Sequence, residues 1–429
     1  MATALHVSRP DGIRPPGDKS ITHRALMLAS LVEGRSRITG ALSAQDTRSV
    51  AAALRTLGCR VSALRREADV VVTGTRWRAP EKTLHCGNSG TAARLLCGLL
   101  AARPFPARLT GDRSLRRRPM GRVIEPLRQM HARFETSVGD RLPLTIHGGP
   151  LVGIRYQSPV ASAQVKTAIL FAALVAGVDA VVEEPWRSRD HTERLLAHLG
   201  VHVLQDGTTV SLPAGDAGRR LPPFELDVPG DPSSAAFLVA ASLLGTGGDV
   251  RIRHVGVNPT RTGFLRVLER MGARVEIVSP RMVGNEPVAD LVVHPVGLRG
   301  THVSASEVPT LVDEVPVLAV LASLATGETV FREVGELRVK ESNRLELLAA
   351  NLRAVGAKAA VEGDSLAING SEYRPSGRVD TAGDHRLAMA FAVLNTVPRA
   401  RITLSERASP GISYPGFFDD LSWVTQRGR

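Results

Sequence analysis

The feature that most constrains the fold is a segment that recurs six times along the 429-residue chain. Each copy opens with small or polar residues and continues as a run rich in alanine and leucine. The starts of the copies lie 70, 74, 69, 82 and 71 residues apart, a regularity that predicts six units of one supersecondary structure, each with a closely packed helix. The copies are GDKSITHRALMLASL from Gly17, GNSGTAARLLCGLLAA from Gly87, ASAQVKTAILFAALVAG from Ala161, GDPSSAAFLVAASLLG from Gly230, VDEVPVLAVLASLATG from Val312 and GDHRLAMAFAVL from Gly383.

The stretches between these helices predict strands and a second helix in each unit. β-Branched residues dominate SRITG from Ser36, ADVVVTG from Ala68 and GDVRIRHV from Gly248, as expected of strands. Amphipathic runs that contain a late glycine, such as residues 47–61 and 343–361, predict the second helices. A unit of helix, strand, helix, strand and strand indicates an α/β (α+β) protein in which small sheets cover helices.

The length of the chain predicts more than one hydrophobic core, because single cores rarely extend over so many residues. Six units divide naturally into two domains of three, and the break falls near Val228-Pro229-Gly230. The first unit begins only after Pro15-Pro16. We therefore expect residues 1–15 and 230–429 to form domain I, and residues 16–229 to form domain II.

Composition argues against a membrane protein and against a disulfide framework. No apolar run reaches the roughly 18 to 20 residues that span a bilayer, and the first residues lack the apolar stretch of a secretion signal. The three cysteines lack the paired spacing of a zinc site and are too few for a framework of bridges. We expect a cytoplasmic protein whose cysteines are buried.

The net charge of +12 indicates an acidic partner, either a nucleic acid or a small anionic ligand. An aromatic content of 4% leaves few platforms for stacking bases, which favours the small ligand. In this chain arginine greatly outnumbers lysine, so the surviving lysines are candidates for positions that need a compact ammonium group. Five of the 54 basic residues are lysines: Lys19, Lys82, Lys166, Lys340 and Lys358.

The polar openings of the six helices predict an anion site. A helix N-terminus presents unpaired N–H groups and the positive end of the helix dipole. If the openings face one cleft between the domains, their side chains suit phosphate and carboxylate groups. These side chains are Lys19, Ser20, Arg24, Asn88, Arg94, Ser162, Gln164, Lys166 and Arg386.

Two further segments add charge to the predicted cleft. Residues 111–122 include five arginines, and residues 338–352 place Lys340 and Arg344 one helical turn apart with Glu341 beside them. Asp313 and Glu341 each lie at a proposed helix opening among cations, so they are candidates for general acid and base. We expect His385 to orient its neighbours rather than to titrate.

Ten segments in order along the chain resemble the 5-enolpyruvylshikimate-3-phosphate (EPSP) synthase family of enolpyruvyl transferases. The resemblance implies a two-domain inverted α/β barrel of six βαβαββ-like units with the active site in the interdomain cleft. It also implies transfer of the enolpyruvyl group of phosphoenolpyruvate to the 5-hydroxyl of shikimate 3-phosphate, with no metal or organic cofactor, by a monomer. The segments are PGDKSITHRALMLASL, GNSGTAARL, TGDRSLRRRPM, SAQVKTAILFAAL, SRDHTE, GDPSSAAF, DEVPVLAVLA, RVKESNRL, GDHRLAMAF and YPGFFDDL.

The resemblance also implies roles for individual residues. Asp313 would act as the base toward the 5-hydroxyl, while Glu341 and Lys19 would move a proton at the methylene carbon of phosphoenolpyruvate. The residues implied to bind shikimate 3-phosphate are Lys19, Ser20, Arg24, Ser162, Gln164, Arg189, Asp313 and Lys340. Those implied to bind phosphoenolpyruvate are Lys19, Gly90, Arg118, Gln164, Arg344 and Arg386.

Three positions depart from the pattern of the family. Ala163 stands where many members have a second serine, and Ile412 stands where the best-studied members have a lysine. Gly90 is retained at the position where alanine in some members excludes the herbicide glyphosate, which predicts that glyphosate competes with phosphoenolpyruvate. Leu95 replaces a proline that is common in sensitive members.

Two alternative functions are weighed against this one. An enolpyruvyl transferase acting on UDP-N-acetylglucosamine shares the fold, but it generally carries a reactive cysteine, or in some members an aspartate, at the centre of the loop equivalent to residues 111–122. A basic nucleic-acid-binding protein fits the charge alone, and it predicts affinity that falls steeply with salt and no turnover.

Overall fold

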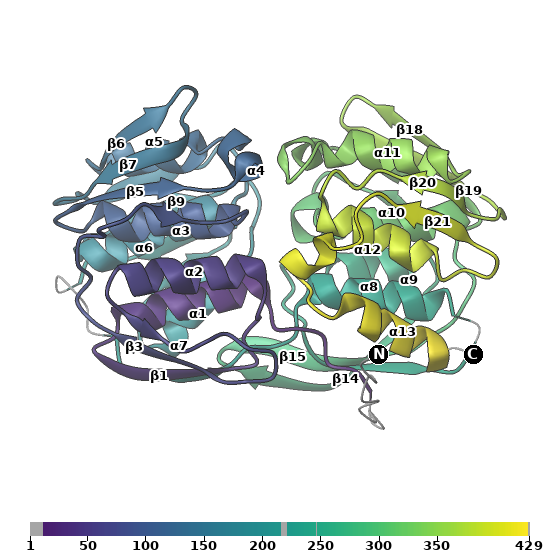
Figure 1. The fold of residues 1–429 in the computed structure, drawn as a ribbon, viewed down its shortest axis with the longest axis horizontal. Coiled ribbons are helices and arrows are strands. Elements are labelled where there is room, and N and C mark those ends of the chain that lie inside the picture. Colours follow the sequence, from purple (N-terminus) through teal and green to yellow (C-terminus); the bar gives the residue numbers. More distant parts are fainter. Residues whose placement is uncertain (1–11, 216–220, 246, 428–429) are drawn as a thin grey trace.

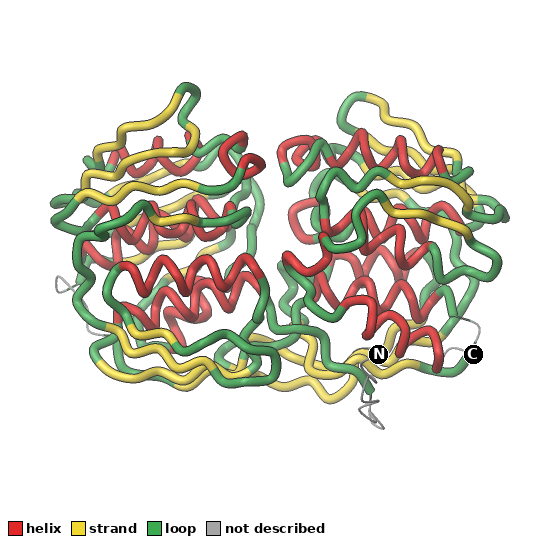
Figure 2. Tube along the Cα trace, viewed as in Figure 1, coloured by secondary structure: helices red, strands yellow, loops and turns green. Residues whose placement is uncertain are grey.

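The computed structural model describes residues 12–215, 221–245 and 247–427. Two halves lie side by side, and in each half the helices occupy the middle while short sheets form the outer layers (Figures 1 and 2). This arrangement confirms the predicted α/β architecture with small sheets over helices. Within the described ranges, no helix combines the length and the apolar character needed to cross a bilayer.

The first helix of every unit forms where the repeat predicts it. These helices are packed in the interior, and every residue of α8 is buried. Polar side chains at the openings cap several of them, as when Asp18 accepts a hydrogen bond from the backbone N–H of Ile21. The six are α1 (Lys19–Leu31), α3 (Gly90–Ala101), α6 (Ala163–Ala176), α8 (Pro232–Leu243), α10 (Val315–Leu324) and α12 (His385–Leu394).

The second helices are amphipathic and cover the first ones. Residues 111–122, which the sequence suggested to be a loop, instead contain the short helix α4 (Arg113–Arg117), which Asp112 caps through the N–H of Leu115. The second helices are α2 (Gln45–Thr56), α5 (Gly121–Gln129), α7 (His191–His198), α9 (Gly263–Arg270), α11 (Arg344–Ala354) and α13 (Phe417–Arg427).

Three sheets share one complete topology. The strand before the first helix pairs in parallel with the strand after it, and an antiparallel hairpin then extends the sheet. The first has the order β4 (Leu84–His85), β5 (Pro106–Thr110), β7 (Arg141–His147), β6 (Arg133–Ser137). The second has β8 (Ile154–Gln157), β9 (Ala180–Glu183), β11 (Thr209–Leu212), β10 (Leu204–Asp206), and the third has β16 (His302–Val303), β17 (Gly327–Phe331), β19 (Ser365–Gly370), β18 (Lys358–Glu362).

In two further sheets, a segment distant in the sequence pairs with the first strand of the unit. β12 (Glu225–Asp227) pairs in parallel with β1 (Gly34–Thr39), so the end of the first half completes its first sheet. Ile13 bridges Ile252 in parallel, so the start of the described chain joins the second half. These sheets have the orders β12, β1, β3 (Val70–Gly74), β2 (Arg60–Val61) and β13 (Val250–Gly256), β15 (Glu286–His294), β14 (Arg274–Val283).

The sixth unit is shorter than the repeat predicts. Its sheet consists of β20 (Ser376–Val379) and β21 (Arg401–Leu404), and the described chain ends within α13 without a further hairpin.

The described residues form two hydrophobic cores. One is built from residues between 21 and 228, and the other from Ile13 and residues between 235 and 424. This division is compatible with domains of residues 16–229 and of residues 1–15 plus 230–429, which stay a prediction at these limits. Cys59, Cys86 and Cys97 are free and buried in the first core.

The two passages of the chain between the halves pair with each other. Gly17 and Gly230 form an antiparallel bridge, with the N–H of Asp18 donating to Pro229 O at 2.7 Å and the N–H of Asp231 donating to Pro16 O at 2.8 Å. α1 and α8 begin directly after these passages. The pairing therefore places two helix N-termini next to each other, between the halves.

A buried arginine stabilises this crossing. The Arg261 guanidinium lies 3.1 Å from Asp18 Oδ2 and 3.3 Å from Asp231 Oδ1, and all three side chains are almost inaccessible to solvent. Burial alone lowers the pKa of Arg261, but the two carboxylates outweigh it and raise the pKa above its usual value. Arg261 therefore stays charged and compensates two anions that the fold buries.

We predict that R261M destabilises the protein strongly. Removing one member of a buried charge network leaves the others unpaired, which costs about 3–5 kcal/mol in the free energy of unfolding. Chemical denaturation followed by fluorescence measures the change. R37M is the control, because Arg37 pairs with Asp69 on the exposed surface and should leave the midpoint almost unchanged. Equal midpoints for both variants would contradict the prediction.

Candidate active site

A cavity between the two halves collects nearly all the predicted site residues. Every one of the six helix openings contributes at least one lining residue, so the predicted convergence of helix N-termini is present. Of the residues predicted to face the cleft or to bind substrate, Arg344 and Lys166 do not line the cavity. The predicted residues that line it are Lys19, Ser20, Arg24, Asn88, Gly90, Arg94, Arg118, Ser162, Gln164, Arg189, Asp313, Lys340, Glu341 and Arg386.

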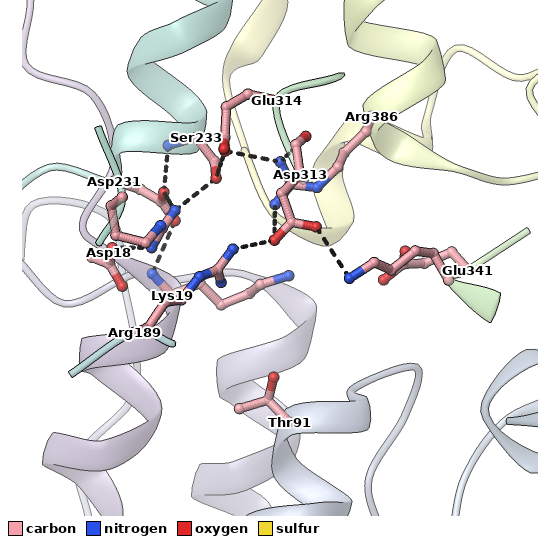
Figure 3. A network of polar contacts seen from close by, with 12 residues as sticks. Asp18, Lys19, Thr91, Arg189, Asp231, Ser233, Asp313, Glu314, Glu341 and Arg386 are labelled. Carbon is pink, nitrogen blue, oxygen red and sulfur yellow. Dashed lines mark hydrogen bonds and ion pairs between the residues drawn. The ribbon is translucent and has the colours of Figure 1, made fainter. Parts of the chain in front are cut away.

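Asp313 lies two residues before α10, at the centre of a ring of cations. Arg189 of the other half hydrogen-bonds to its carboxylate, and Arg386 approaches from α12 with Nη2 at 3.8 Å (Figure 3). Lys340 Nζ lies 3.8 Å from Oδ1.

This ring controls the charge of Asp313. Burial raises the pKa of its carboxyl, but Arg386, Lys340, Arg189 and Arg344 outweigh burial and hold the pKa well below its usual range. Asp313 is therefore an anion and, in this arrangement, only weakly basic.

Glu341 is the second carboxylate of the cavity. It lies between the 3-10 helix η2 (Gly335–Val339) and α11, with Oε1 3.6 Å from Arg118 Nη1 of the other half. Burial raises the pKa of Glu341, but Arg344, Arg118, His385 and Lys19 lower it more, so the pKa lies well below normal. Both predicted proton-moving carboxylates are thus ionised.

Arg344 lies behind the wall of the cavity and is fully buried. Its Nε donates to Asp384 at 2.9 Å, its Nη2 donates to Glu341, and its Nη1 lies 3.7 Å from Asp313 Oδ1. Nη1 has no hydrogen-bond partner within the described chain. Arg344 thus touches both carboxylates but presents no surface to the cavity in this arrangement.

The side of the cavity formed by the first half combines several cations with amide and hydroxyl groups. Lys19 Nζ donates to Asp46 Oδ2 at 3.1 Å. Arg24 is buried and donates to the hydroxyls of Thr192 and Thr167, and burial lowers its pKa only to about 10, so it stays charged at neutral pH. An anionic ligand therefore meets cations on both sides of the cavity.

Gly90 and Gln164 lie where α3 and α6 begin. Gln164 Oε1 accepts a hydrogen bond from Arg94 Nη1 at 2.7 Å, and its Nε2 donates to Thr91 at 2.9 Å. A Cβ added at Gly90 would lie 2.8 Å from Arg94 Nη1 and 3.4 Å from Arg118 Nη1. A methyl group there would occupy the space between two guanidinium groups.

The prediction that Lys166 faces the cleft is wrong. Its ammonium is buried between Glu184 and Glu193, each at 2.8 Å, and it does not line the cavity. Lys166 follows Gln164 by two residues, and a step of two turns a side chain to the opposite side of a helix.

His385 is neutral at physiological pH. Burial lowers the pKa of its imidazole to about 4. Neither ring nitrogen has a hydrogen-bond partner within the described chain. The ring thus makes no hydrogen bond with a described residue through which it could orient a neighbour, and the expectation that His385 orients its neighbours rather than titrates stays a prediction.

Several lining residues were not singled out from the sequence. Ser233 and Asp231 belong to the GDPSS opening of α8, so the repeat itself could have indicated them. Arg261 lies in no recurrent segment and carried no signal. The other lining residues of this kind include Asp46, Thr91, Arg122, Ser188 and Glu336. No group of three or more His, Cys, Asp or Glu side chains in the described ranges is placed to hold a metal ion.

Comparison with known proteins identifies relatives over almost the whole chain. A 3-phosphoshikimate 1-carboxyvinyltransferase of Alkalilimnicola ehrlichii is 46% identical over 424 residues, covering 97% of this chain and 94% of that protein. One of Halorhodospira halophila is 47% identical over 412 residues, covering 95% and 92%.

Solved structures and a family model agree with these relatives. A structure of EPSP synthase from Acinetobacter baumannii superposes with a TM-score of 0.84 at 37% identity, covering 96% of this chain and 95% of that one. The family described as EPSP synthase (3-phosphoshikimate 1-carboxyvinyltransferase) matches residues 11–421. The chain therefore belongs to the EPSP synthase family.

Proposed function

We propose that this chain transfers the enolpyruvyl group of phosphoenolpyruvate to the 5-hydroxyl of shikimate 3-phosphate and releases phosphate. One observation carries the proposal: the Asp313 carboxylate lies in the cavity surrounded by cations from both halves. A reaction between two polyanions requires cations to bind them and a carboxylate to take a proton from the attacking hydroxyl. The relatives described above carry names that denote this activity.

The geometry favours this function over the two alternatives. The cations converge inside a cavity between the halves, which suits small anions better than a nucleic-acid backbone. Within residues 111–122 there is no cysteine, and Asp112 is engaged as the cap of α4. We further propose that the enzyme acts as a monomer in the cytoplasm, as part of aromatic amino-acid biosynthesis.

The two substrates would share the cavity. We assign shikimate 3-phosphate to Lys19, Ser20, Arg24, Ser162, Gln164, Arg189, Asp313 and Lys340. We assign phosphoenolpyruvate to Lys19, Gly90, Arg118, Gln164, Arg344 and Arg386, of which Arg344 must first gain access to the cavity from its buried position.

The reaction consists of an addition and an elimination. In the addition, the oxygen at carbon 5 bonds to C2 of phosphoenolpyruvate, the hydroxyl loses its proton and the methylene carbon gains one. In the elimination, the bond from C2 to the phosphate oxygen breaks, and the methyl carbon returns a proton. Asp313 takes the hydroxyl proton. Glu341 and Lys19 transfer the protons that the methylene carbon of phosphoenolpyruvate gains and then loses.

Substrate binding would strengthen Asp313 as a base. Four cations of the protein hold its pKa down. Phosphate and carboxylate groups that bind to those cations offset their charge, so the pKa of Asp313 rises in the ternary complex. The base would then be strongest when both substrates are present.

Contacts across the cavity would keep water away from the reaction. Arg189 meets Asp313, Arg118 meets Glu341, and the hydroxyl of Ser114 donates to Glu341 O at 3.2 Å. Each contact joins one half to the other. Excluding water protects a cationic intermediate from hydrolysis and strengthens every electrostatic interaction around it.

We predict that D313N lowers kcat by about 10² to 10⁴, because the amide cannot accept the hydroxyl proton. Phosphate release with both substrates measures the rate. D206N is the matched control, since Asp206 is exposed on β10 and should leave the rate unchanged. Parental activity in D313N would overturn the proposed mechanism. No phosphate release by the parent would overturn the proposed function.

We predict that K19M raises KM for both substrates about ten- to hundredfold, the loss expected for a charge-assisted hydrogen bond to each. Initial rates with each substrate varied in turn measure the two constants. K82M serves as control, because Lys82 is exposed. A change confined to one substrate would contradict the shared position of Lys19.

We predict that glyphosate competes with phosphoenolpyruvate and that G90A raises its inhibition constant about tenfold or more, by placing a methyl group beside Arg94. The KM for phosphoenolpyruvate should rise less. Inhibition measured at several phosphoenolpyruvate concentrations tests both statements. G149A is the control, since a Cβ at Gly149 meets nothing within 4 Å. No competition at millimolar glyphosate would refute the prediction.

A further inference from the structure

Lys166 forms a buried ion cluster beneath the part of the cavity that the first half supplies. Its Nζ lies 2.8 Å from Glu184 Oε2 and 2.8 Å from Glu193 Oε1. The three residues come from α6, from the loop after β9 and from α7, and each is at most 5% exposed. None of the three lines the cavity. The mechanism above gives this cluster no role.

Glu184 connects this cluster to the cavity. Its Oε1 accepts the backbone N–H of Ser162 at 2.8 Å, and its Oε2 accepts the hydroxyl of Ser188 at 2.8 Å. Ser162 and Ser188 line the cavity, and Arg189 directly follows Ser188. One carboxylate therefore fixes the opening of α6 and the loop that carries Arg189.

The positive charge of Lys166 offsets the negative charge of the buried carboxylates of Glu184 and Glu193. Two buried carboxylates close to a phosphate site would repel the phosphate and each other unless cations offset them. Lys166 contacts both carboxylates, and Arg24 is a second buried cation whose protonated form is favoured by Glu193. Two anions and two cations then leave the base of the site nearly neutral.

The cation at this site is a lysine in a chain that is rich in arginine. The compact ammonium of Lys166 contacts carboxylates at 2.8 Å on two sides and is 1% exposed. Most cations in this chain are arginines, so Lys166 is one of few positions that retain lysine.

We propose that Lys166 and Glu184 are positioning residues for the phosphate group of shikimate 3-phosphate. They do not touch the substrate. Glu184 orients Ser162, Ser188 and the start of the Arg189 segment, and Lys166 offsets the negative charge that this requires. The inference rests on the proposed function, and it separates the two substrates, since none of these contacts reaches Arg118 or Arg386.

The test is K166M, which removes the charge and keeps the length of the side chain. KM for shikimate 3-phosphate should rise about tenfold or more, because unpaired buried carboxylates disturb the phosphate site. KM for phosphoenolpyruvate should change less than about threefold, and kcat at saturation should stay within the same limit. K358M is the control, because Lys358 is exposed at the start of β18.

The double variant K166M/E184Q distinguishes positioning from a simple packing defect. Glutamine can still accept the N–H of Ser162, and it removes one of the two anions that lose Lys166, while Arg24 remains as a buried cation that interacts with Glu193. The double variant should therefore recover most of the affinity for shikimate 3-phosphate that K166M loses. A packing defect at Lys166 predicts no recovery.

Each outcome decides the inference. Equal increases in both KM values, unchanged KM values, or no recovery in the double variant would overturn it. If K166M does not fold, E184A decides, because alanine cannot accept the N–H of Ser162: a selective rise in KM for shikimate 3-phosphate supports the inference and any other result contradicts it. A parent without turnover would overturn the proposed function and this inference together, whereas an active parent with parental KM values in K166M would overturn the inference alone.

Discussion

The structure depends on the antiparallel pairing of the two segments where the chain passes between its halves. Gly17 pairs with Gly230, and the hydrogen bonds on either side join Asp18 and Asp231 to the opposite passage. α1 and α8 begin there, so their N-termini meet between the halves. The same crossing lets β12 complete the first sheet of the first half and lets Ile13 join the first sheet of the second half. Arg261 offsets the charge of the two aspartates that this geometry buries.

The cavity follows from the crossing and from the repeat. Six similar units, three in each half, direct the N-termini of six helices at one cavity between the halves, which suits anions before any side chain is considered. Arginines and lysines add to this potential, while Asp313 and Glu341 are held as anions within it. Ion pairs that now join the two halves could exchange for pairs with substrate phosphates and carboxylates. Beneath the cavity, the positive charge of Lys166 likewise offsets the negative charge of Glu184.

Much of the fold was predictable from the sequence because the repeated segments mark the six structural units. The six interior helices lie within the predicted segments, since their alanine- and leucine-rich runs and polar openings are strong local signals. The helix α4 was missed because five residues between an N-cap and a proline carry little periodicity. The described part of the sixth unit has no further hairpin after β21, and the sequence did not indicate this because the six units were recognised from their helices and not from their strands.

The site was predictable where motifs and helix openings coincide, as at Lys19, Gln164 and Asp313. It was not predictable where function depends on side-chain direction. Lys166 lies at a polar helix opening, so the sequence suggests that it faces the cleft. Because it follows Gln164 by two residues, its side chain points to the opposite side of the helix, into the interior. Arg344 belongs to a cationic motif, yet Asp384 and Glu341 hold it behind the cavity wall. Arg261 belongs to no motif, and its contacts arise only when distant segments cross.

The most direct test of the account is identification of the products formed from shikimate 3-phosphate and phosphoenolpyruvate by nuclear magnetic resonance. The account predicts inorganic phosphate and an enolpyruvyl ether at carbon 5 in equal amounts, with both substrates consumed together. Unchanged substrates, or phosphate released from phosphoenolpyruvate without formation of the ether, would contradict it.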